Sequence, residues 1–158
     1  MDISGGHNII QTVFIECRSM YRKDGPEKMK PIGETEFVQG IAAQSASGYY
    51  GPTNVAAGIV GFADLTLAAA VEPVLEAHIA ASRDRFRGIR YISAWHESSD
   101  ITHSRDHPRG VLRNPKFREG FAYLHKYNLS FDSWLYHTQL AELIDLAKAF
   151  PETPIILD

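Results

Sequence analysis

The sequence predicts an α/β fold in which a parallel sheet of about five strands alternates with helices. Two observations support this prediction. Five short apolar runs are separated by four segments with helical periodicity, and such alternation is typical of βαβ units. Most of these runs are too apolar for the alternation of a half-exposed sheet, which favours strands that are buried on both faces.

The five expected strands are short, and the last one is the shortest. In chain order they are Asn8–Glu16, Asn54–Ala63, Phe86–Trp95, Leu129–Tyr136 and Thr153–Asp158. Two of the segments that lead from a strand to the next helix are long and polar, whereas the segments that lead from a helix to a strand are short. Because parallel α/β folds gather their chemistry at the carboxyl ends of the strands, these long segments mark the side where a site is expected.

Four helices are expected between these strands. Asp64 and Asn114 are suited to cap the second and third helix, and Pro115 follows at the first helical position of the third. Pro73 falls inside the second helical pattern and predicts a kink or a late start there. The fourth pattern carries an apolar stripe at the i, i+3, i+4, i+7 spacing. The patterns span Glu34–Ser47, Leu65–Ser82, Asn114–Tyr127 and Thr138–Phe150, and the stripe is Leu140, Leu143, Ile144 and Ala147.

A doubly wound, Rossmann-like sheet is the competing architecture. It is disfavoured because no G-x-G-x-x-G turn follows any expected strand and the chain has no P-loop. The 158 residues suffice for one core, and no Pro/Gly/Ser-rich linker divides them, so residues 1–158 are expected to form a single domain.

Composition excludes several classes of partner. The formal net charge is −3 and no run of Lys or Arg gathers on one face, so neither nucleic acid nor membrane is expected as a partner. The start, "MDISGGHNII", does not resemble a signal peptide, and no apolar run is long enough to span a bilayer. The single cysteine, Cys17, allows no disulfide within the chain. We therefore expect a cytoplasmic location.

The ends of the expected strands carry ionisable groups. General acid–base catalysis and metal binding both need such groups to converge on one point, and the carboxyl ends of parallel strands provide that convergence. The strand ends are Glu16 with Cys17, Asp64, Trp95 with His96, His137, and Asp158.

Three of these residues have a functional and a structural interpretation. His137 either faces a pocket, beside the aromatic Tyr136, or belongs to the start of a helix capped by Thr138. Glu16 is either a buried carboxylate with a partner or the first solvated residue of its loop. Arg90 lies inside an expected strand, where an unpaired charge is costly, so it pairs internally or holds an anionic substrate near the mouth of the sheet.

The remaining histidines are weaker candidates. The segment "HESSDITHSRDH" contains His96, His103 and His107, but its spacing matches no metal-ligand template, and a polar lid is the preferred interpretation. His78 and His125 lie inside helical patterns and are expected at the surface or its boundary. Cys17 has no obvious base beside it, which argues against a thiol nucleophile.

Several segments together resemble the amidohydrolase-related proteins, in the lactonase-like branch near the sugar-lactone and pyrone-dicarboxylate lactonases. The segments keep their order and spacing over nearly the whole chain, although none is diagnostic alone. They are "TVFIECRSMYR", "VAAGIVGFADL", "FRGIRYISAW", "NPKFREGFAYL" and "LSFDSWLYHTQLAELIDLAKAFPETPIILD". The resemblance implies a (β/α)8 TIM-type barrel, of which this chain is a partial barrel with about five parallel strands.

The chain departs from the pattern of this family in two places. It has no H-x-H pair at the end of a first strand, and it stops at Asp158, before the later strand–helix units and the late catalytic Asp. The resemblance implies a divalent metal such as Zn, with ligands mostly outside this chain. It matches Arg90 and His137 residue by residue, and Glu16 with Cys17. As further substrate-binding candidates we include Tyr21, Arg22, His96 and Tyr136.

The expected activity is hydrolysis of a lactone, ester or amide of a small carboxylated substrate. Arg90 would neutralise the substrate carboxylate, His137 would position the substrate, and Glu16 completes the expected catalytic set. Two alternatives stay open: non-oxidative decarboxylation on a similar barrel, and a truncated, non-catalytic barrel fragment that survives as a homo-oligomer. We expect the isolated chain to show little or no hydrolase activity. We also expect Glu16, Arg90 and His137 to share one end and one face of the sheet.

Overall fold

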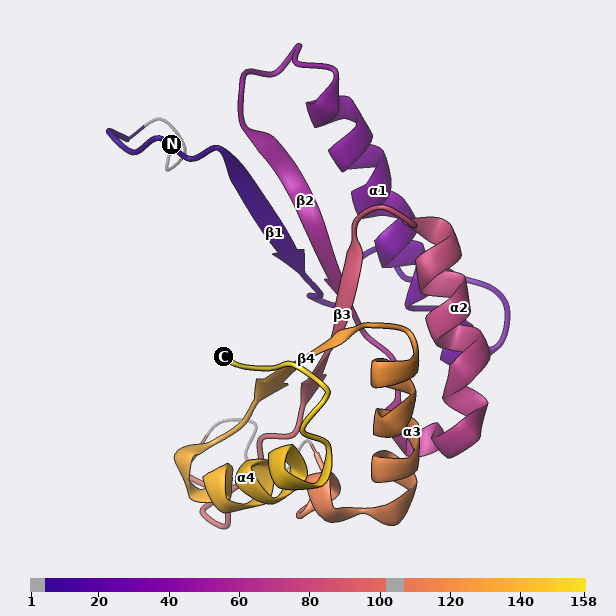
Figure 1. Cartoon of the computed structure of the whole chain (residues 1–158), viewed down its shortest axis with the longest axis vertical. Coiled ribbons are helices and arrows are strands. Elements are labelled where there is room, and N and C mark those ends of the chain that lie inside the picture. Colours follow the sequence, from indigo (N-terminus) through magenta and orange to yellow (C-terminus); the bar gives the residue numbers. More distant parts are fainter. Residues whose placement is uncertain (1–4, 102–106) are drawn as a thin grey trace. The chain divides into compact units, whose positions relative to one another are not determined.

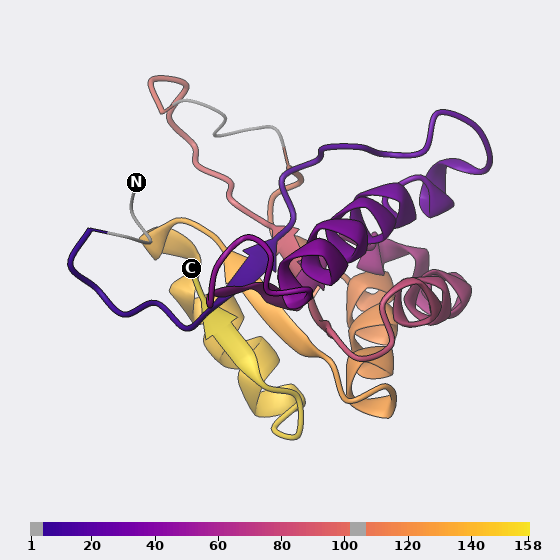
Figure 2. The ribbon, with the colours of Figure 1, turned by 90° about the horizontal axis from the view of Figure 1, so that it is seen from above.

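The computed structural model describes residues 5–101 and 107–158, and Figures 1 and 2 show it from two sides. One sheet has its strands hydrogen-bonded in the chain order β1-β2-β3-β4-β5. β1 pairs with β2, β3 with β4, and β4 with β5, each time in parallel. The predicted α/β fold with five parallel strands is confirmed, and the order does not reverse as a doubly wound sheet requires. The strands are Gln11–Ile15 (β1), Asn54–Gly61 (β2), Phe86–Ile92 (β3), Ser130–Trp134 (β4) and Ile155–Leu157 (β5).

All four predicted helices are present. Pro73 is the second residue of α2, which begins late, as predicted, after the 3-10 segment η3. Within the described ranges, no helix is both long and apolar enough to cross a bilayer. The α-helices are Ile32–Ala46 (α1), Glu72–Ala81 (α2), Pro115–Lys126 (α3) and Leu140–Ala149 (α4), and the 3-10 segments are Glu27–Met29 (η2), Leu65–Val71 (η3), Val111–Arg113 (η4) and His137–Gln139 (η5).

Both predicted caps form. The Asp64 Oδ1 atom accepts a hydrogen bond of 2.9 Å from the Thr66 backbone N–H at the start of η3. The Asn114 Oδ1 atom accepts one of 2.9 Å from the Lys116 N–H at the start of α3, and Pro115 occupies the first turn. Each cap satisfies a backbone donor that the helix itself leaves open.

The chain divides into two compact units, and each is described by itself. The first unit combines Met1–Gly61 with Glu76–Arg87, and the second combines Phe62–Leu75 with Gly88–Asp158. The prediction of a single domain is not tested by this division and stays a prediction.

The first unit packs α1 against β2 (Figure 1). His78, expected at the surface or its boundary, is fully buried there, so that prediction was wrong. The ring is accommodated because its Nδ1 lies 2.8 Å from the Thr35 hydroxyl and its face stacks on Phe86 at 4.8 Å between ring centroids. A buried imidazole is tolerated when its nitrogens are satisfied and its faces packed.

The second unit has an aromatic core under α3. Phe117, Phe121 and Phe131 are fully buried, and the rings of Phe121 and Phe131 meet edge to face at 5.1 Å between centroids. Gly120 lets α3 approach η3, since a Cβ atom at this position would lie 2.1 Å from the Leu65 carbonyl oxygen. Close packing at Gly120 therefore fixes α3 beside η3.

The apolar stripe of α4 is only partly buried. Leu143 and the neighbouring Leu146 lie in the core, whereas Leu140 is 39% and Ile144 54% exposed. On β5, which lies beside β4 (Figure 2), Ile156 and Leu157 are exposed as well. The second unit thus presents apolar side chains at its surface.

Candidate active site at the carboxyl ends of the strands

Glu16, the first candidate, follows β1 in the first unit. Its side chain is buried, with 1% of the residue exposed, and its backbone N–H donates to the Val60 carbonyl at 2.9 Å. Of the two interpretations drawn from the sequence, the buried carboxylate is the one that the structure has.

Glu34, in the first turn of α1, organises the loop after β1 and was missed by sequence reasoning. Its Oε1 atom accepts hydrogen bonds from the Cys17 N–H at 3.1 Å, the Ser19 N–H at 2.8 Å and the Ser19 hydroxyl at 3.1 Å. The Cys17 thiol lies 3.4 Å from the same oxygen. Glu34 is 2% exposed, so a buried carboxylate holds this loop in place.

Tyr21 and Arg22, predicted to bind substrate, have different surroundings. Burial raises the pKa of the Tyr21 phenol, and the carboxylates of Glu16 and Glu34 raise it further, so Tyr21 stays a protonated donor. Arg22 is exposed and is held by Glu36, which accepts from the Arg22 Nε at 3.1 Å. The hydrogen bond from Arg22 holds the pKa of Glu36 below its usual range. The structure therefore brings Tyr21, but not the guanidinium of Arg22, close to the buried carboxylates.

Arg90, in the second unit, lies among carboxylates. Its Nη1 atom is 3.6 Å from the Asp158 Oδ2 atom, and Asp132 is its partner in the register of β3 and β4. Asp132 is 3% exposed; burial raises its pKa, the Asp158 carboxylate adds to the rise, and Arg90 opposes it. The cost of a charge inside a strand is thus met by pairing, and the predicted contact between Arg90 and a substrate carboxylate stays a prediction.

A pocket of about 260 Å³ lies at the carboxyl ends of β3 and β4 in the second unit. It mixes an aromatic wall with charged and hydrogen-bonding groups, as small-molecule sites do. The residues that line it are Trp95, His96, Glu97, Arg109, Thr138, Gln139 and Glu142. Two of them, Trp95 and His96, are the strand end that the sequence predicted.

His96 is oriented by its own loop. Its Nδ1 atom accepts a hydrogen bond of 3.0 Å from the Ser98 N–H, so the neutral ring carries its proton on Nε2. The ring also meets Tyr136 edge to face, with 6.0 Å between the ring centroids. His96 therefore offers an N–H donor, suited to polarise a carbonyl group, rather than a free basic nitrogen.

Gln139 joins the ends of β3 and β4 and was also missed by sequence reasoning. Its Nε2 donates to the Ser93 carbonyl at 2.8 Å, and its Oε1 accepts from the Trp95 N–H at 2.8 Å and from the Tyr136 N–H at 3.4 Å. Only 4% of the residue is exposed, and both the donor and the acceptor of its amide bond to backbone groups. Gln139 is a positioning residue, because it fixes the backbone that carries Trp95 and His96.

His137, the residue on which the sequence prediction centred, is exposed and is the first residue of η5, beyond the carboxyl end of β4. It is not among the residues that line the pocket. The helix-start interpretation agrees with this position, since η5 leads directly into α4, but Thr138 is not the cap, because Tyr136 occupies the N-cap of η5. A catalytic role for His137 stays a prediction.

The described residues do not form a metal centre. Among residues 5–101 and 107–158, no three His, Cys, Asp or Glu side chains gather as a metal ion needs. His103, one of the three histidines of the predicted lid, lies outside the described residues. The expectation of a divalent metal with ligands mostly outside this chain stays a prediction.

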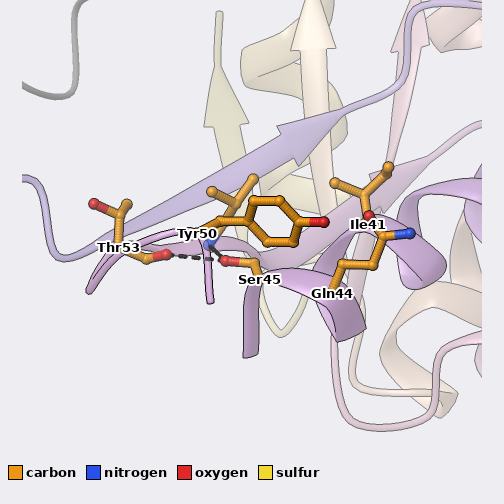
Figure 3. Close-up of a pocket in the computed structure, with 6 residues that line it drawn as sticks. Ile41, Gln44, Ser45, Tyr50 and Thr53 are labelled. Carbon is orange, nitrogen blue, oxygen red and sulfur yellow. Dashed lines mark hydrogen bonds between the residues drawn. The ribbon is translucent and has the colours of Figure 1, made fainter. Parts of the chain in front are cut away.

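A second pocket, of about 160 Å³, lies in the first unit near the amino-terminal end of β2. Figure 3 shows the Ser45 hydroxyl beside Thr53, to whose carbonyl it donates at 2.9 Å. The same hydroxyl accepts from the Val55 N–H at 2.9 Å, so Ser45 holds the start of β2. Ile41, Gln44 and Tyr50 complete the wall. This pocket lies at the end of β2 opposite to its carboxyl end, and none of the described residues that line it carries a carboxylate or imidazole, so we assign no catalysis to it.

Comparisons with known proteins agree with the sequence prediction at the level of the family. Residues 53–158 match the family model described as "Amidohydrolase". The chain is 34% identical over 151 residues to the uncharacterized protein y4mH of Sinorhizobium fredii (strain NBRC 101917 / NGR234). That alignment covers 96% of this chain and 44% of the relative, so the chain spans less than half the length of that protein.

A solved structure of an amidohydrolase from Burkholderia multivorans with bound HEPES aligns with 93% of this chain and 54% of its own length. The TM-score is 0.45 and the sequence identity 18%. The family assignment does not depend on this likeness, since the family model alone covers about two thirds of the chain. The chain belongs to the amidohydrolase family.

Proposed function

We propose that a protein containing this chain hydrolyses a lactone, or a related ester or amide, of a small carboxylated substrate, with its site at the carboxyl ends of the strands. The observation that carries the proposal is the pocket beyond β3 and β4, which places an imidazole, a guanidinium and the carboxylates of Glu97 and Glu142 around one hollow. Membership of the amidohydrolase family supports hydrolysis as the reaction class.

In this proposal His96 donates its Nε2–H to the carbonyl oxygen that gains charge as water attacks. Donors aimed at such an oxygen lower the barrier because the charge develops in a site with little water. Gln139 holds the Trp95–His96 backbone in place, and Glu142 accepts a hydrogen bond from the substrate. The group that activates the water is expected outside the described residues, and Arg90 and His137 stay candidates for binding and positioning.

The test follows lactone and ester hydrolysis in a pH-stat by the proton that is released, and amide hydrolysis by a colorimetric assay of the released amine, because that amine takes up the proton at neutral pH. A panel of lactones, esters and amides with and without a carboxylate should be offered to this chain and to a protein of the relative's length that contains it, each with and without Zn²⁺. We expect little or no turnover by the 158-residue chain and turnover of a carboxylated lactone, ester or amide by the longer protein. Release of CO₂ instead would favour the decarboxylase alternative, and no turnover of any kind would refute the proposal.

A second candidate, a non-catalytic fragment that acts by self-association, has one observation in its favour. Leu140, Ile144, Ile156 and Leu157 are exposed apolar residues of the second unit. Uncovered apolar side chains and strand edges favour association. Size-exclusion chromatography with light scattering tests this candidate. It is supported if the chain forms a dimer that Ile144→Lys and Leu157→Lys convert to a monomer, and if the longer protein shows no catalytic activity.

A further inference from the structure

Among the described residues, Arg109 supplies the one cationic side chain that lines the pocket beyond β3 and β4. Its Cζ atom lies 4.7 Å from the centroid of the Trp95 ring, so the guanidinium rests on the indole. Stacking restrains the guanidinium without using its N–H donors. The described residues show no hydrogen bond or ion pair to Arg109, so these donors remain available to a ligand. A guanidinium presented in this way suits a planar, bidentate acceptor such as a carboxylate.

Glu142, in the first turn of α4, provides a hydrogen-bond acceptor in the same pocket. Its Oε2 atom is buried and accepts no hydrogen bond from any residue in the described ranges. A buried carboxylate oxygen without a donor is costly, and a ligand that brings a donor removes that cost. A hydroxyl or ammonium group on the ligand would meet this need.

We propose that the pocket binds a small carboxylate that also carries a hydrogen-bond donor, with the carboxylate on Arg109 and the donor on Glu142. A phosphate suits the pocket less, because its second charge would be placed near the carboxylate of Glu142, whereas a carboxylate brings one negative charge. This inference rests on the proposed function, because it names the class of substrate that the proposed site would bind. Because binding can be measured without turnover, the inference about the ligand and the proposed function can be refuted separately.

The test uses the fluorescence of Trp95 itself. The chain contains two tryptophans, and Trp134 does not line the pocket, so Trp134→Phe leaves Trp95 as the reporter. Four probes share one carbon skeleton: butyrate, butyramide without the charge, and 3-hydroxybutyrate and 3-aminobutyrate with an added donor. Inorganic phosphate is the fifth. We expect the two donor-bearing acids to bind more tightly than butyrate, and butyrate more tightly than butyramide or phosphate; which donor binds better separates hydroxyl from ammonium ligands.

The variants separate the two contacts. Arg109→Gln should weaken binding of 3-hydroxybutyrate about tenfold or more, since a charge-assisted pair is lost, and Arg109→Lys should retain part of it. Glu142→Ala should remove the preference for the donor-bearing acids over butyrate. Matched controls are Arg113→Gln and Glu152→Ala, both exposed and outside the pocket, which should bind as the parent does.

Three results overturn the inference: equal affinity for butyrate and butyramide, an unchanged affinity in Arg109→Gln, or phosphate binding as tight as that of the acids. Equal affinity for butyrate and both donor-bearing acids overturns the role of Glu142. Selective binding in a protein that hydrolyses nothing would remove the proposed function and leave this inference standing. Turnover without such selectivity would do the reverse.

Discussion

Replacing Gln139 by methionine should destabilise the second unit, because the Gln139 amide links the backbone that follows β3 to the N-cap of η5. Methionine has a similar length and no hydrogen-bonding amide. The change leaves the Ser93 carbonyl and the Trp95 N–H without their partners at 2.8 Å. The contact with the Tyr136 N–H, at 3.4 Å, is weak and adds little.

The magnitude follows from the two short bonds. Leaving a buried polar group unsatisfied costs about 1–3 kcal/mol, so two such groups give roughly 2–6 kcal/mol. Ser93 is fully buried, but Trp95 is only half-buried, so water can satisfy part of its loss. We therefore expect about 2–4 kcal/mol off the free energy of unfolding for Gln139→Met.

Urea unfolding followed by circular dichroism measures this loss, provided that the slope of the free energy against urea concentration is unchanged. Gln44→Met, at an exposed position of α1, is the matched control and should stay within about 0.5 kcal/mol of the parent. Gln139→Glu keeps the acceptor for Trp95 but places a buried carboxylate oxygen against the Ser93 carbonyl, so at neutral pH it should cost at least as much as Gln139→Met. An unfolding free energy of Gln139→Met equal to that of the control would refute the positioning role.

Three further predictions concern the same unit. Burial, aided by the Asp64 carboxylate, raises the pKa of Tyr91 to about 12. The protonated phenol therefore stabilises the fold fully below the ordinary phenol pKa of 10.0, and this stabilisation is lost as the pH rises through about 12. Tyr91→Phe should flatten the dependence of the unfolding free energy on pH in that window. Burial raises the pKa of Asp132, so the ionised carboxylate opposes folding. Asp132→Asn should therefore raise the free energy of unfolding at pH 7 and lose that advantage at acidic pH. A lower free energy of unfolding for Asp132→Asn at pH 7 would show that the contact with Arg90 dominates. Gly120→Ala should lower the free energy of unfolding by about 1–3 kcal/mol or more, because its Cβ would lie 2.1 Å from the Leu65 carbonyl oxygen. Gly40→Ala is the control and should be neutral or stabilising, since a Cβ there would meet no atom within 4 Å. Equal thermal midpoints of the two variants would contradict the close packing at Gly120.

The strands, the helices and both caps could be predicted because each is determined by residues close in sequence. Apolar runs placed the strands within a few residues, and Asp64 and Asn114 cap as their positions indicate. The apolar stripe of α4 was less informative, since Leu140 and Ile144 satisfy the helical period and yet are exposed. Periodicity shows that a helix has an apolar side but not how much of that side is covered.

The candidate site was predicted only in part, because its members are joined by contacts that no local pattern records. His96 was found as a strand end, whereas Arg109, Gln139 and Glu142 lie in a polar loop and a helical pattern, where such residues are usually solvated. Gln139 bonds to Ser93 and Trp95 across more than 40 residues. Glu34, beside the β1 loop, was missed for the same reason; an acidic residue in a first helical turn normally serves the helix dipole.

Whether the site lies at the carboxyl ends of the strands around His96 can be tested by comparing two histidine variants. In a protein of the relative's length that contains this chain, kcat/KM for the best carboxylated substrate should be measured for His96→Ala and for His125→Ala, an exposed histidine of α3. Loss of a donor to a developing oxyanion costs roughly 100-fold or more, so we predict that fall for His96→Ala and no change for His125→Ala. Equal kcat/KM values for His96→Ala and the parent protein would contradict the account.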